Sequence, residues 1–194
     1  IHESNSFAGK SNILLGKKAS KIFTGTDAME KFFLANKIMV TGNPVRSVIA
    51  RSAVTREEGL RFFGVSPQQK TVLVVGGSLG AKTINETIDK HLDELLQAGL
   101  QVIWQTGKPY AVTAKARVQG KPGVWANDFI TDMQFAYAAA DIIVARAGAM
   151  TVAEICVVQK PALFVPYPYA AEDHQTANAK ALVGVPVLDQ LPAH

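Results

Sequence analysis

The sequence lacks several features that would place a protein in a class at once. Only one of its 194 residues, Cys156, is a cysteine, which excludes an internal disulfide and a cysteine-rich zinc site. It has no apolar run long enough to cross a bilayer, no signal-peptide pattern and no repeat. Because it starts with Ile1 rather than Met, we expect it to begin inside a longer protein. A single thiol suits a reducing compartment, and Cys156, in an apolar helical pattern, is expected to be a small buried side chain rather than a nucleophile.

The composition is that of an ordinary globular protein, but the charge is uneven. Hydrophobic residues make up 48% and charged residues 19% of the chain. Residues 1–61 hold ten Lys and Arg against five Asp and Glu, whereas residues 62–194 hold ten against eleven, so the net charge of +4 comes from the first third. This bias favours an anionic partner, such as a phospholipid surface, a diphosphate or a nucleic acid. A merely solvated basic face is the alternative.

From about residue 70 onward, short apolar runs alternate with helical patterns. The runs are continuous, as expected for strands buried on both faces of a sheet. Strict alternation predicts an α/β fold with a parallel, doubly wound sheet, in which ligands bind beyond the carboxyl ends of the strands. The expected strands are Thr71–Val75, Gln101–Gln105, Val124–Ala126, Asp141–Ala145, Ala162–Val165 and Val185–Leu188. The expected helices cover residues 82–98, 109–118, 132–140, 150–158 and 174–183.

The first 45 residues are a separate piece. Helices at 9–18 and 26–35 and strands at Lys21–Gly25 and Ile38–Thr41 would form the last two βα units of another sheet. The cluster Gly42-Asn43-Pro44 then interrupts regular structure. We therefore expect a remnant of a first domain at 1–45, a connector at 46–66 with a short helix at Arg56–Phe63, and a second domain at 67–194.

The stretch VLVVGGSLGAKTIN (72–85) reads as a buried strand, a glycine turn and the start of a helix. It misses the P-loop pattern because Ala81 replaces the second glycine, and it misses the dinucleotide fingerprint at Ser78 and Ala81. Backbone N–H groups and the Ser78 hydroxyl at a helix N-terminus still suit a phosphate. A tight strand-to-helix turn without a ligand is the equal alternative.

A second turn of the same kind lies in DIIVARAGAMTVAEI (141–155). The N–H groups of Ala149 to Thr151 would face a phosphate oxygen, and Glu154 would accept hydrogen bonds from two neighbouring hydroxyls, as on a ribose. The alternative is a capping box, with Thr151 as N-cap and Glu154 returning to the backbone. Two such turns in one sheet favour a diphosphate held without a P-loop lysine or an obligatory metal.

Two further segments follow expected strands. In VPYPYAAEDHQTANAKAL (165–182), the amides of Gln175 and Asn178 share a helical face and suit sugar hydroxyls. Asp173 is a candidate cap, and His174 fits a polar loop residue better than a base. After the third strand, Phe129-Ile130-Thr131-Asp132-Met133 could hold a flat base, although core packing is the commoner role of Phe129 and Met133.

Six segments together are more specific than any one of them: HESNSFAGKSN (2–12), TGNPVR (41–46), GGSLGA (76–81), FITDM (129–133), RAGAMTVAEI (146–155) and HQTANA (174–179). In this order they resemble the MurG family of bacterial GlcNAc transferases, which convert lipid I to lipid II. The resemblance covers most of residues 2–183. It implies the GT-B architecture, two Rossmann-like domains with a cleft between them, of which this chain holds the C-terminal one and a remnant of the N-terminal one.

The resemblance also implies roles toward UDP-GlcNAc. Ile130 would meet the uracil through its backbone, Glu154 would bind the ribose and Gln175 the GlcNAc hydroxyls. Ser78 and the turn that begins at Ala149 would hold the diphosphate. Arg46 would reach the nucleotide from the interdomain side, and Asn5 would approach from the other domain. The implied donor-binding set is Asn5, Arg46, Ser78, Ile130, Ala149, Met150, Thr151, Val152, Ala153, Glu154 and Gln175, with Gly77, Phe129, Met133 and Asn178 as further contacts.

The implied activity is inverting transfer of GlcNAc from UDP-GlcNAc to lipid I. The enzyme would be peripheral, on an anionic membrane surface at the cytoplasmic side of the bacterial inner membrane, with no cofactor, no metal and no nucleic-acid partner. Most of the family's first domain, including its acceptor loop and proposed base, is absent from the sequence. The catalytic base is therefore left unassigned, and none of the four histidines is assigned to that role. Residues 184–194 match the family poorly.

Two other readings of the same residues stay open. One is another GT-B enzyme that acts on UDP-GlcNAc, such as an epimerase or a lipid glycosyltransferase. The other, from a different class, is a non-catalytic nucleotide-binding module or a degenerate P-loop NTPase. Binding of ATP without binding of UDP-GlcNAc would favour the second.

Overall fold

The computed structural model describes residues 1–77, 79–170 and 173–182. The chain divides into two compact units. The first unit comprises Ile1–Pro44, Ala147–Ala153 and the part of the chain from Pro166 onward; the second comprises Val45–Arg146 and Glu154–Val165. The domain limits expected at residues 45 and 66 stay a prediction.

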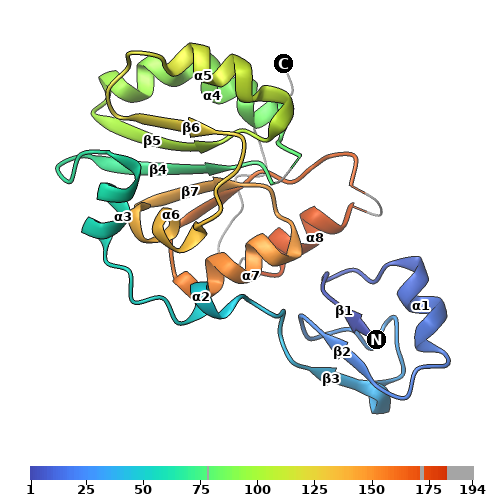
Figure 1. The fold of residues 1–194 in the computed structure, drawn as a ribbon. Coiled ribbons are helices and arrows are strands. Elements are labelled where there is room, and N and C mark those ends of the chain that lie inside the picture. Colours follow the sequence, from blue (N-terminus) through green and yellow to red (C-terminus); the bar gives the residue numbers. More distant parts are fainter. Residues whose placement is uncertain (78, 171–172, 183–194) are drawn as a thin grey trace. The chain divides into compact units, whose positions relative to one another are not determined.

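The second unit is built on a five-stranded parallel sheet with the order β6-β5-β4-β7-β8 (Figure 1). Its first strand in the sequence, β4, is central in this order, and every side chain after Lys70 is buried, as expected for a strand covered on both faces. The strands are β4 (Lys70–Val75), β5 (Leu100–Gln105), β6 (Val124–Asn127), β7 (Ile142–Ala145) and β8 (Ala162–Phe164).

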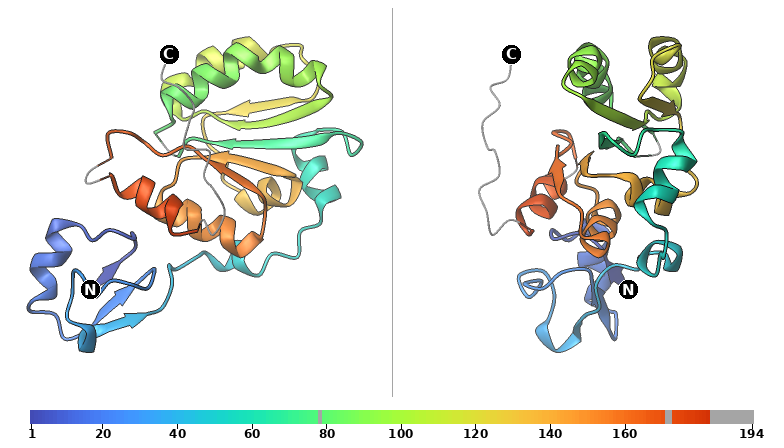
Figure 2. Two further views of the ribbon diagram at one scale, coloured as in Figure 1. Left: turned by 180° about the vertical axis from the view of Figure 1, so that it is seen from behind. Right: turned by 90° about the vertical axis from the view of Figure 1, so that its left-hand side faces the viewer.

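Helices cover both faces of this sheet, and each face has its own core (Figures 1 and 2). On one face α4 and α5 lie side by side, and the helical spacing of Ile84, Ile88 and Leu92 turns them onto Val74 and Trp104. On the other face α3 and α6 pack around Leu73, Ile103 and Ile143. The helices are α2 (Ser47–Ala50), α3 (Arg56–Phe63), α4 (Lys82–Gln97), α5 (Ala111–Val118), α6 (Met133–Ala139) and α7 (Ala149–Val158).

The order of the strands fixes where ligands are expected. The chain runs from β4 outward to β5 and β6, then returns to the other side of β4 with β7 and β8. The direction of winding therefore reverses between β4 and β7. In doubly wound sheets the crevice beyond the carboxyl ends at such a reversal is the usual ligand site, and the glycine turn after β4 lies at this edge.

The amino edge of the same sheet is closed by charged side chains. Asp141 accepts hydrogen bonds from the Thr71 N–H at 2.9 Å, from Lys70 at 2.9 Å and from Arg56 at 3.1 Å. Burial alone would raise the pKa of this carboxyl, but the three donors outweigh it and lower the pKa to about 2. Asp141 is thus committed to structure at the edge opposite the ligand turns, where it could not serve a P-loop magnesium ion.

The first unit holds a smaller parallel sheet with the order β1-β2-β3. Ala8, Ile22, Met29 and Phe33 form its core. Its elements are β1 (His2–Glu3), α1 (Lys10–Gly16), β2 (Ile22–Thr24), β3 (Ile38–Val40), the N-terminal part of α7 and α8 (His174–Lys180).

Most expected elements are confirmed, and two expectations are wrong. The helix expected at 26–35 is absent: Ala28 adopts a left-handed φ of 54°, and the bonds from the Phe32 and Phe33 N–H groups to the Met29 carbonyl form only a single turn. That single turn already buries Met29 and Phe33, so no helix is required to place these apolar side chains in the core. Cys156 is exposed rather than buried, because α7 turns the preceding Ile155 inward and the next residue lies about 100° further round the helix. The strand expected at Val185–Leu188 lies outside the described residues.

Candidate functional site

The glycine turn leaves the carboxyl end of β4 in a conformation that requires its glycines. Gly77 and Gly80 adopt φ values of 83° and 76°, which side chains rarely tolerate. A Cβ on Gly76 would lie 2.6 Å from the Ala81 nitrogen. The three glycines therefore let the main chain pass close to the start of α4. Ser78, predicted to hold the diphosphate, lies outside the described residues, so its role stays a prediction.

The turn after β5, which the sequence analysis did not single out, packs against the glycine turn. At the end of β5, a Cβ on Gly107 would lie 2.3 Å from the Gly80 nitrogen, so the two turns touch backbone to backbone. The Thr106 carbonyl accepts a hydrogen bond of 2.7 Å from the buried Asn85 side chain on α4. The signal for this role was Gln-Thr-Gly directly after an apolar strand, next to a ligand turn in the sheet.

Gln105, the last residue of β5, joins the glycine turn to the turn after β6. Its amide nitrogen donates to the Gly77 carbonyl at 3.2 Å, and its amide oxygen accepts from the Ile130 N–H at 3.1 Å. The side chain is 3% exposed. A single buried amide thus fixes two turns that both end beyond the sheet's carboxyl edge.

The residues expected to hold a flat base separate into two environments. Ile130 and Met133 are buried in the core beside α6, whereas Phe129 is 49% exposed. Met133 packs in the core, as its alternative role requires, and its contact with the donor stays a prediction. Phe129 keeps an exposed ring at the carboxyl edge, where a base could stack on it.

Glu154, predicted to bind a ribose, is held by two side chains of the second unit. Its carboxylate accepts a hydrogen bond of 2.8 Å from the Tyr137 hydroxyl and lies 3.6 Å from the Arg46 guanidinium. Burial, followed by the Glu154 charge, raises the pKa of Tyr137, so its hydroxyl stays a donor. The sequence analysis missed Tyr137, because α6 reads as an ordinary apolar helix.

The capping box proposed as the alternative for Glu154 is wrong. Helix α7 begins at Ala149, and its first helical bond runs from the Val152 N–H to the Gly148 carbonyl. Thr151 is therefore inside the first turn and is not the N-cap. The N–H groups of Ala149 to Thr151 precede the hydrogen-bond ladder, as an anion at a helix N-terminus would require.

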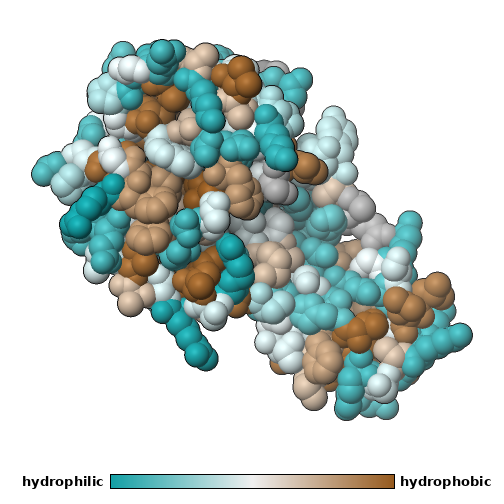
Figure 3. Space-filling model, viewed as in Figure 1, coloured by the Kyte–Doolittle hydropathy of each residue, from teal (hydrophilic) through white to brown (hydrophobic). Residues whose placement is uncertain are grey.

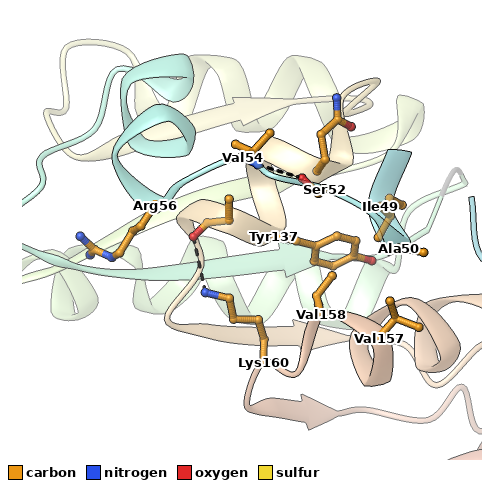
Figure 4. Close-up of a pocket in the computed structure, with 11 residues that line it drawn as sticks. Ile49, Ala50, Ser52, Val54, Arg56, Tyr137, Val157, Val158 and Lys160 are labelled. Carbon is orange, nitrogen blue, oxygen red and sulfur yellow. Dashed lines mark hydrogen bonds between the residues drawn. The ribbon is translucent and has the colours of Figure 1, made fainter. Parts of the chain in front are cut away.

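The pocket drawn in Figure 4 lies on the same side of the sheet as α6, but it is not lined by any residue of the predicted donor set. It measures about 320 Å³, and the Tyr137 ring points into it while its hydroxyl is bonded to Glu154. Lys160 donates to the Ala140 carbonyl at 2.8 Å and so caps the end of α6. The pocket therefore supports the position of Tyr137 rather than forming the predicted site.

In the first unit, Asn5 and Asn178 bind each other. The Asn178 side chain is 3% exposed, donates to the Asn5 side chain and to the Ala147 carbonyl, both at 3.1 Å, and accepts the Ser6 N–H at 2.9 Å. The Asn5 amide also donates to the buried Glu3 carboxylate at 3.3 Å. Both N–H groups of the Asn178 amide are engaged, so the sugar contact predicted for Asn178 would have to use its amide oxygen.

Glu3 organises the loop that carries Asn5. Burial would raise the pKa of its carboxyl, but the Asn5 and Gly9 N–H groups and the side chains of Asn5 and Asn12 donate to it, and the net pKa is lowered. A charged carboxylate with four donors fixes residues 4–9 more firmly than a turn motif would. The sequence analysis used Glu3 only as part of a motif.

The polar side chains in and just before α8 form hydrogen bonds within the same segment. The Gln175 side chain accepts a hydrogen bond of 2.9 Å from the Tyr167 N–H. Asp173 occupies the N-cap position, but its carboxylate accepts the Thr176 hydroxyl at 2.6 Å and no backbone N–H. His174 is the first residue of α8. The contact of Gln175 with the sugar stays a prediction.

Within the parts of the chain that the structure describes, no three His, Cys, Asp or Glu side chains gather as a metal site would need. In those same parts, no helix combines the length and apolar character needed to cross a membrane.

Comparison with known proteins agrees with this geometry. Residues 71–186 match the model of the glycosyltransferase family 28 C-terminal domain. The chain is 53% identical over 185 residues to a UDP-N-acetylglucosamine--N-acetylmuramyl-(pentapeptide) pyrophosphoryl-undecaprenol N-acetylglucosamine transferase of Parabacteroides distasonis, and 52% identical over 186 residues to the protein of the same name from Phocaeicola vulgatus. Each match covers 94% of this chain but 50% of the relative, so the chain spans about half the length of these relatives.

Solved structures give the same result at lower identity. The crystal structure of Acinetobacter baumannii MurG is 33% identical, with a TM-score of 0.66 over 93% of this chain and 49% of that one. The glycosyltransferase of kitacinnamycin, 17% identical with a TM-score of 0.59, shares the fold.

Proposed function

This chain belongs to glycosyltransferase family 28, whose C-terminal domain it carries, and from that premise we propose that it is the donor-binding part of an inverting GlcNAc transferase. The proposed donor is UDP-GlcNAc and the proposed acceptor is lipid I. The observation that supports this most directly is the set of turns beyond the carboxyl edge of the sheet, which suits a nucleotide sugar. The names of the relatives specify the same donor and acceptor classes for those proteins.

The donor is bound part by part. The uracil lies at the turn after β6, against the exposed Phe129 ring. Because Gln105 occupies the Ile130 N–H, the Ile130 carbonyl is the group offered to the base edge; an acceptor there suits the N3–H of uracil and not the bare N3 of cytosine. Glu154, oriented by Tyr137, accepts the ribose hydroxyls, with Arg46 beside it.

The diphosphate is held by main chain rather than by a lysine or a metal. Gly77, Ser78 and the N–H groups of Ala149, Met150 and Thr151, with Val152 and Ala153 in the next turn, form this part of the proposed set. The positive end of α7 stabilises the charge that develops on departing UDP. Gln175, Asn5 and Asn178 are the remaining proposed contacts, toward GlcNAc.

The transfer proceeds as a single displacement. The acceptor hydroxyl attacks the anomeric carbon while the bond to the UDP oxygen breaks, which inverts the configuration. A base must accept the hydroxyl proton from within about 3 Å, and we propose that it comes from the half of the full-length enzyme that these residues do not cover. The chain alone would then bind the donor without transferring it.

An anionic membrane surface at the cytoplasmic side of the bacterial inner membrane is the proposed place of action. The acceptor is lipid-linked, and basic residues near a membrane surface contribute about 1 kcal/mol each. Helix α1 exposes 67% of Leu14 and 54% of Leu15 beside Lys17 and Lys18, and Figure 3 shows apolar and hydrophilic residues next to each other over this helix. This combination is typical of a peripheral contact.

Calorimetry with UDP-GlcNAc, UDP-GalNAc, ATP and NAD tests the proposed donor. We expect heat of binding with UDP-GlcNAc, a weaker response with UDP-GalNAc, and none with ATP or NAD. Binding of ATP without UDP-GlcNAc would contradict the proposal and favour a degenerate P-loop NTPase. An assay with UDP-GlcNAc and a lipid I analogue, run beside a full-length relative, tests whether this chain transfers the sugar. Product formed by this chain at the relative's rate would contradict the proposal that the base lies outside these residues.

A further inference from the structure

Gln105 is a buried polar residue that does not belong to the proposed donor-binding set. It ends β5, which lies between β4 and β6 in the sheet. Gly77 lies two residues beyond β4 and Ile130 three residues beyond β6, so neither backbone group belongs to the strand ladders. Gln105 pairs with both of them and is 3% exposed.

We propose that Gln105 is a positioning residue that holds the base turn and the diphosphate turn at a fixed separation. The proposal rests on the proposed function, because it assigns the two turns to one nucleoside diphosphate. It does not require Gln105 to touch the ligand.

The planar amide suits this task because one edge donates and the other accepts. The donor edge meets the Gly77 carbonyl, and the acceptor edge meets the Ile130 N–H. Buried hydrogen bonds of this kind are expensive to leave unmade. Because this link is formed before binding, a ligand that spans both turns does not have to pay the entropy of ordering them.

The same strand supplies a matched control. Gln101 lies four residues earlier, on the same face of β5, and is fully buried. It also bridges main chain: its amide nitrogen donates to the Ser66 carbonyl at 2.7 Å, and its oxygen accepts the Ser66 N–H at 2.8 Å. Its partners, however, lie at the amino edge, away from both ligand turns.

The test compares Gln105→Leu with Gln101→Leu in the 194-residue chain. Gln105→Leu removes the partner of the Gly77 carbonyl and of the Ile130 N–H. Gln101→Leu removes the partner of both Ser66 backbone groups and also of the buried Thr71 hydroxyl. We therefore expect Gln101→Leu to lose at least as much stability in urea unfolding as Gln105→Leu. Only Gln105→Leu should weaken UDP binding in calorimetry, by about tenfold or more. The loss should be larger for UDP than for uridine, because uridine has no diphosphate and meets only one of the two turns that Gln105 joins.

A second variant separates the two halves of the bridge. In Gln105→Glu the carboxylate still accepts the Ile130 N–H, but it cannot donate to the Gly77 carbonyl. We expect the Ile130 amide to stay protected in hydrogen exchange while UDP affinity falls at least as far as in Gln105→Leu. This variant also carries the comparison if Gln105→Leu does not fold.

Two outcomes would contradict different statements. If the unchanged chain binds UDP and both leucine variants bind it equally well, the role of Gln105 is wrong and the proposed function stands. If the unchanged chain does not bind UDP, the proposed function is wrong, and this inference is overturned with it.

Discussion

The two edges of the five-stranded sheet are organised in different ways. At the amino edge, charged and amide side chains satisfy the strand ends: Asp141 with Arg56 and Lys70, and Gln101 with Ser66. At the carboxyl edge, glycines with positive φ bring backbone against backbone. The first edge is closed by side chains and serves stability. The second leaves main-chain groups at the surface, where a phosphate or a base edge can reach them, and its geometry depends on glycine.

The largest expected difference between the edges comes from the two glycines that flank β5. Gly99 and Gly107 have φ values of 78° and 72°, but a Cβ on Gly99 meets nothing within 4 Å, whereas one on Gly107 would lie 2.3 Å from the Gly80 nitrogen. Gly99→Ala should cost about 1–3 kcal/mol of unfolding free energy from backbone strain. Gly107→Ala should cost a further ~1–3 kcal/mol from overpacking and should weaken UDP binding by more than tenfold.

Urea unfolding and UDP titration of both alanine variants measure these differences. Equal losses of stability, with UDP affinity unchanged in both, would show that the carboxyl edge is no more constrained than the amino edge.

The second prediction concerns the amino edge alone. The pKa of Asp141 is lowered from 3.8 to about 2 in the folded chain. A lowered pKa stabilises the fold above the unfolded value, and this stability is lost as the pH falls from about 4 through about 2. Because the carboxylate is partly solvated, we expect Asp141→Asn to cost about 1–2 kcal/mol at pH 7, with UDP affinity unchanged.

The measurement is the free energy of unfolding between pH 7 and pH 2, with Asp141→Asn beside the unchanged chain. The two curves should converge toward pH 2. A difference that persists undiminished at pH 2 would mean that packing rather than charge accounts for Asp141.

Much of the fold could be predicted from the sequence, because local patterns decide it. The strands of the second unit are continuous apolar runs, and the helix at Arg56–Phe63 begins with the capping box of Thr55 and Glu58. The apolar spacing wrongly predicted a helix at 26–35, where a single turn is enough to bury Met29 and Phe33. Local patterns also failed for residues that act on distant partners: Gln105 lies 25 residues from Ile130, and Tyr137 lies 17 residues from Glu154.

The third prediction concerns Glu154 at the carboxyl edge. If it binds the ribose, Glu154→Ala should weaken UDP binding by about tenfold, as expected for loss of hydrogen bonds to a charged group. Glu154→Gln keeps one acceptor and should weaken it less. Tyr137→Phe keeps the carboxylate but removes its donor, so its effect should lie between that of Glu154→Gln and no change.

Thermal melts accompany these titrations. Loss of stability in Glu154→Ala by about 1 kcal/mol, the worth of a helix cap, with UDP affinity unchanged, would reduce Glu154 to a structural residue.

The smallest effect is expected at Lys82, the residue that most resembles part of a P-loop. Its side chain is 84% exposed, and its ammonium lies 3.7 Å from the Glu86 carboxylate one helical turn later. A P-loop lysine contacts phosphates directly and works with magnesium, whereas here Ala81 replaces the glycine that would let the loop wrap around them. Lys82→Ala should therefore leave UDP-GlcNAc affinity within about threefold, less than the loss of one charge-assisted hydrogen bond. Glu86→Gln is the control, because it breaks the same ion pair without removing the ammonium. A tenfold loss in Lys82→Ala alone, or a magnesium requirement for binding, would mean that the carboxyl edge uses a side-chain charge after all.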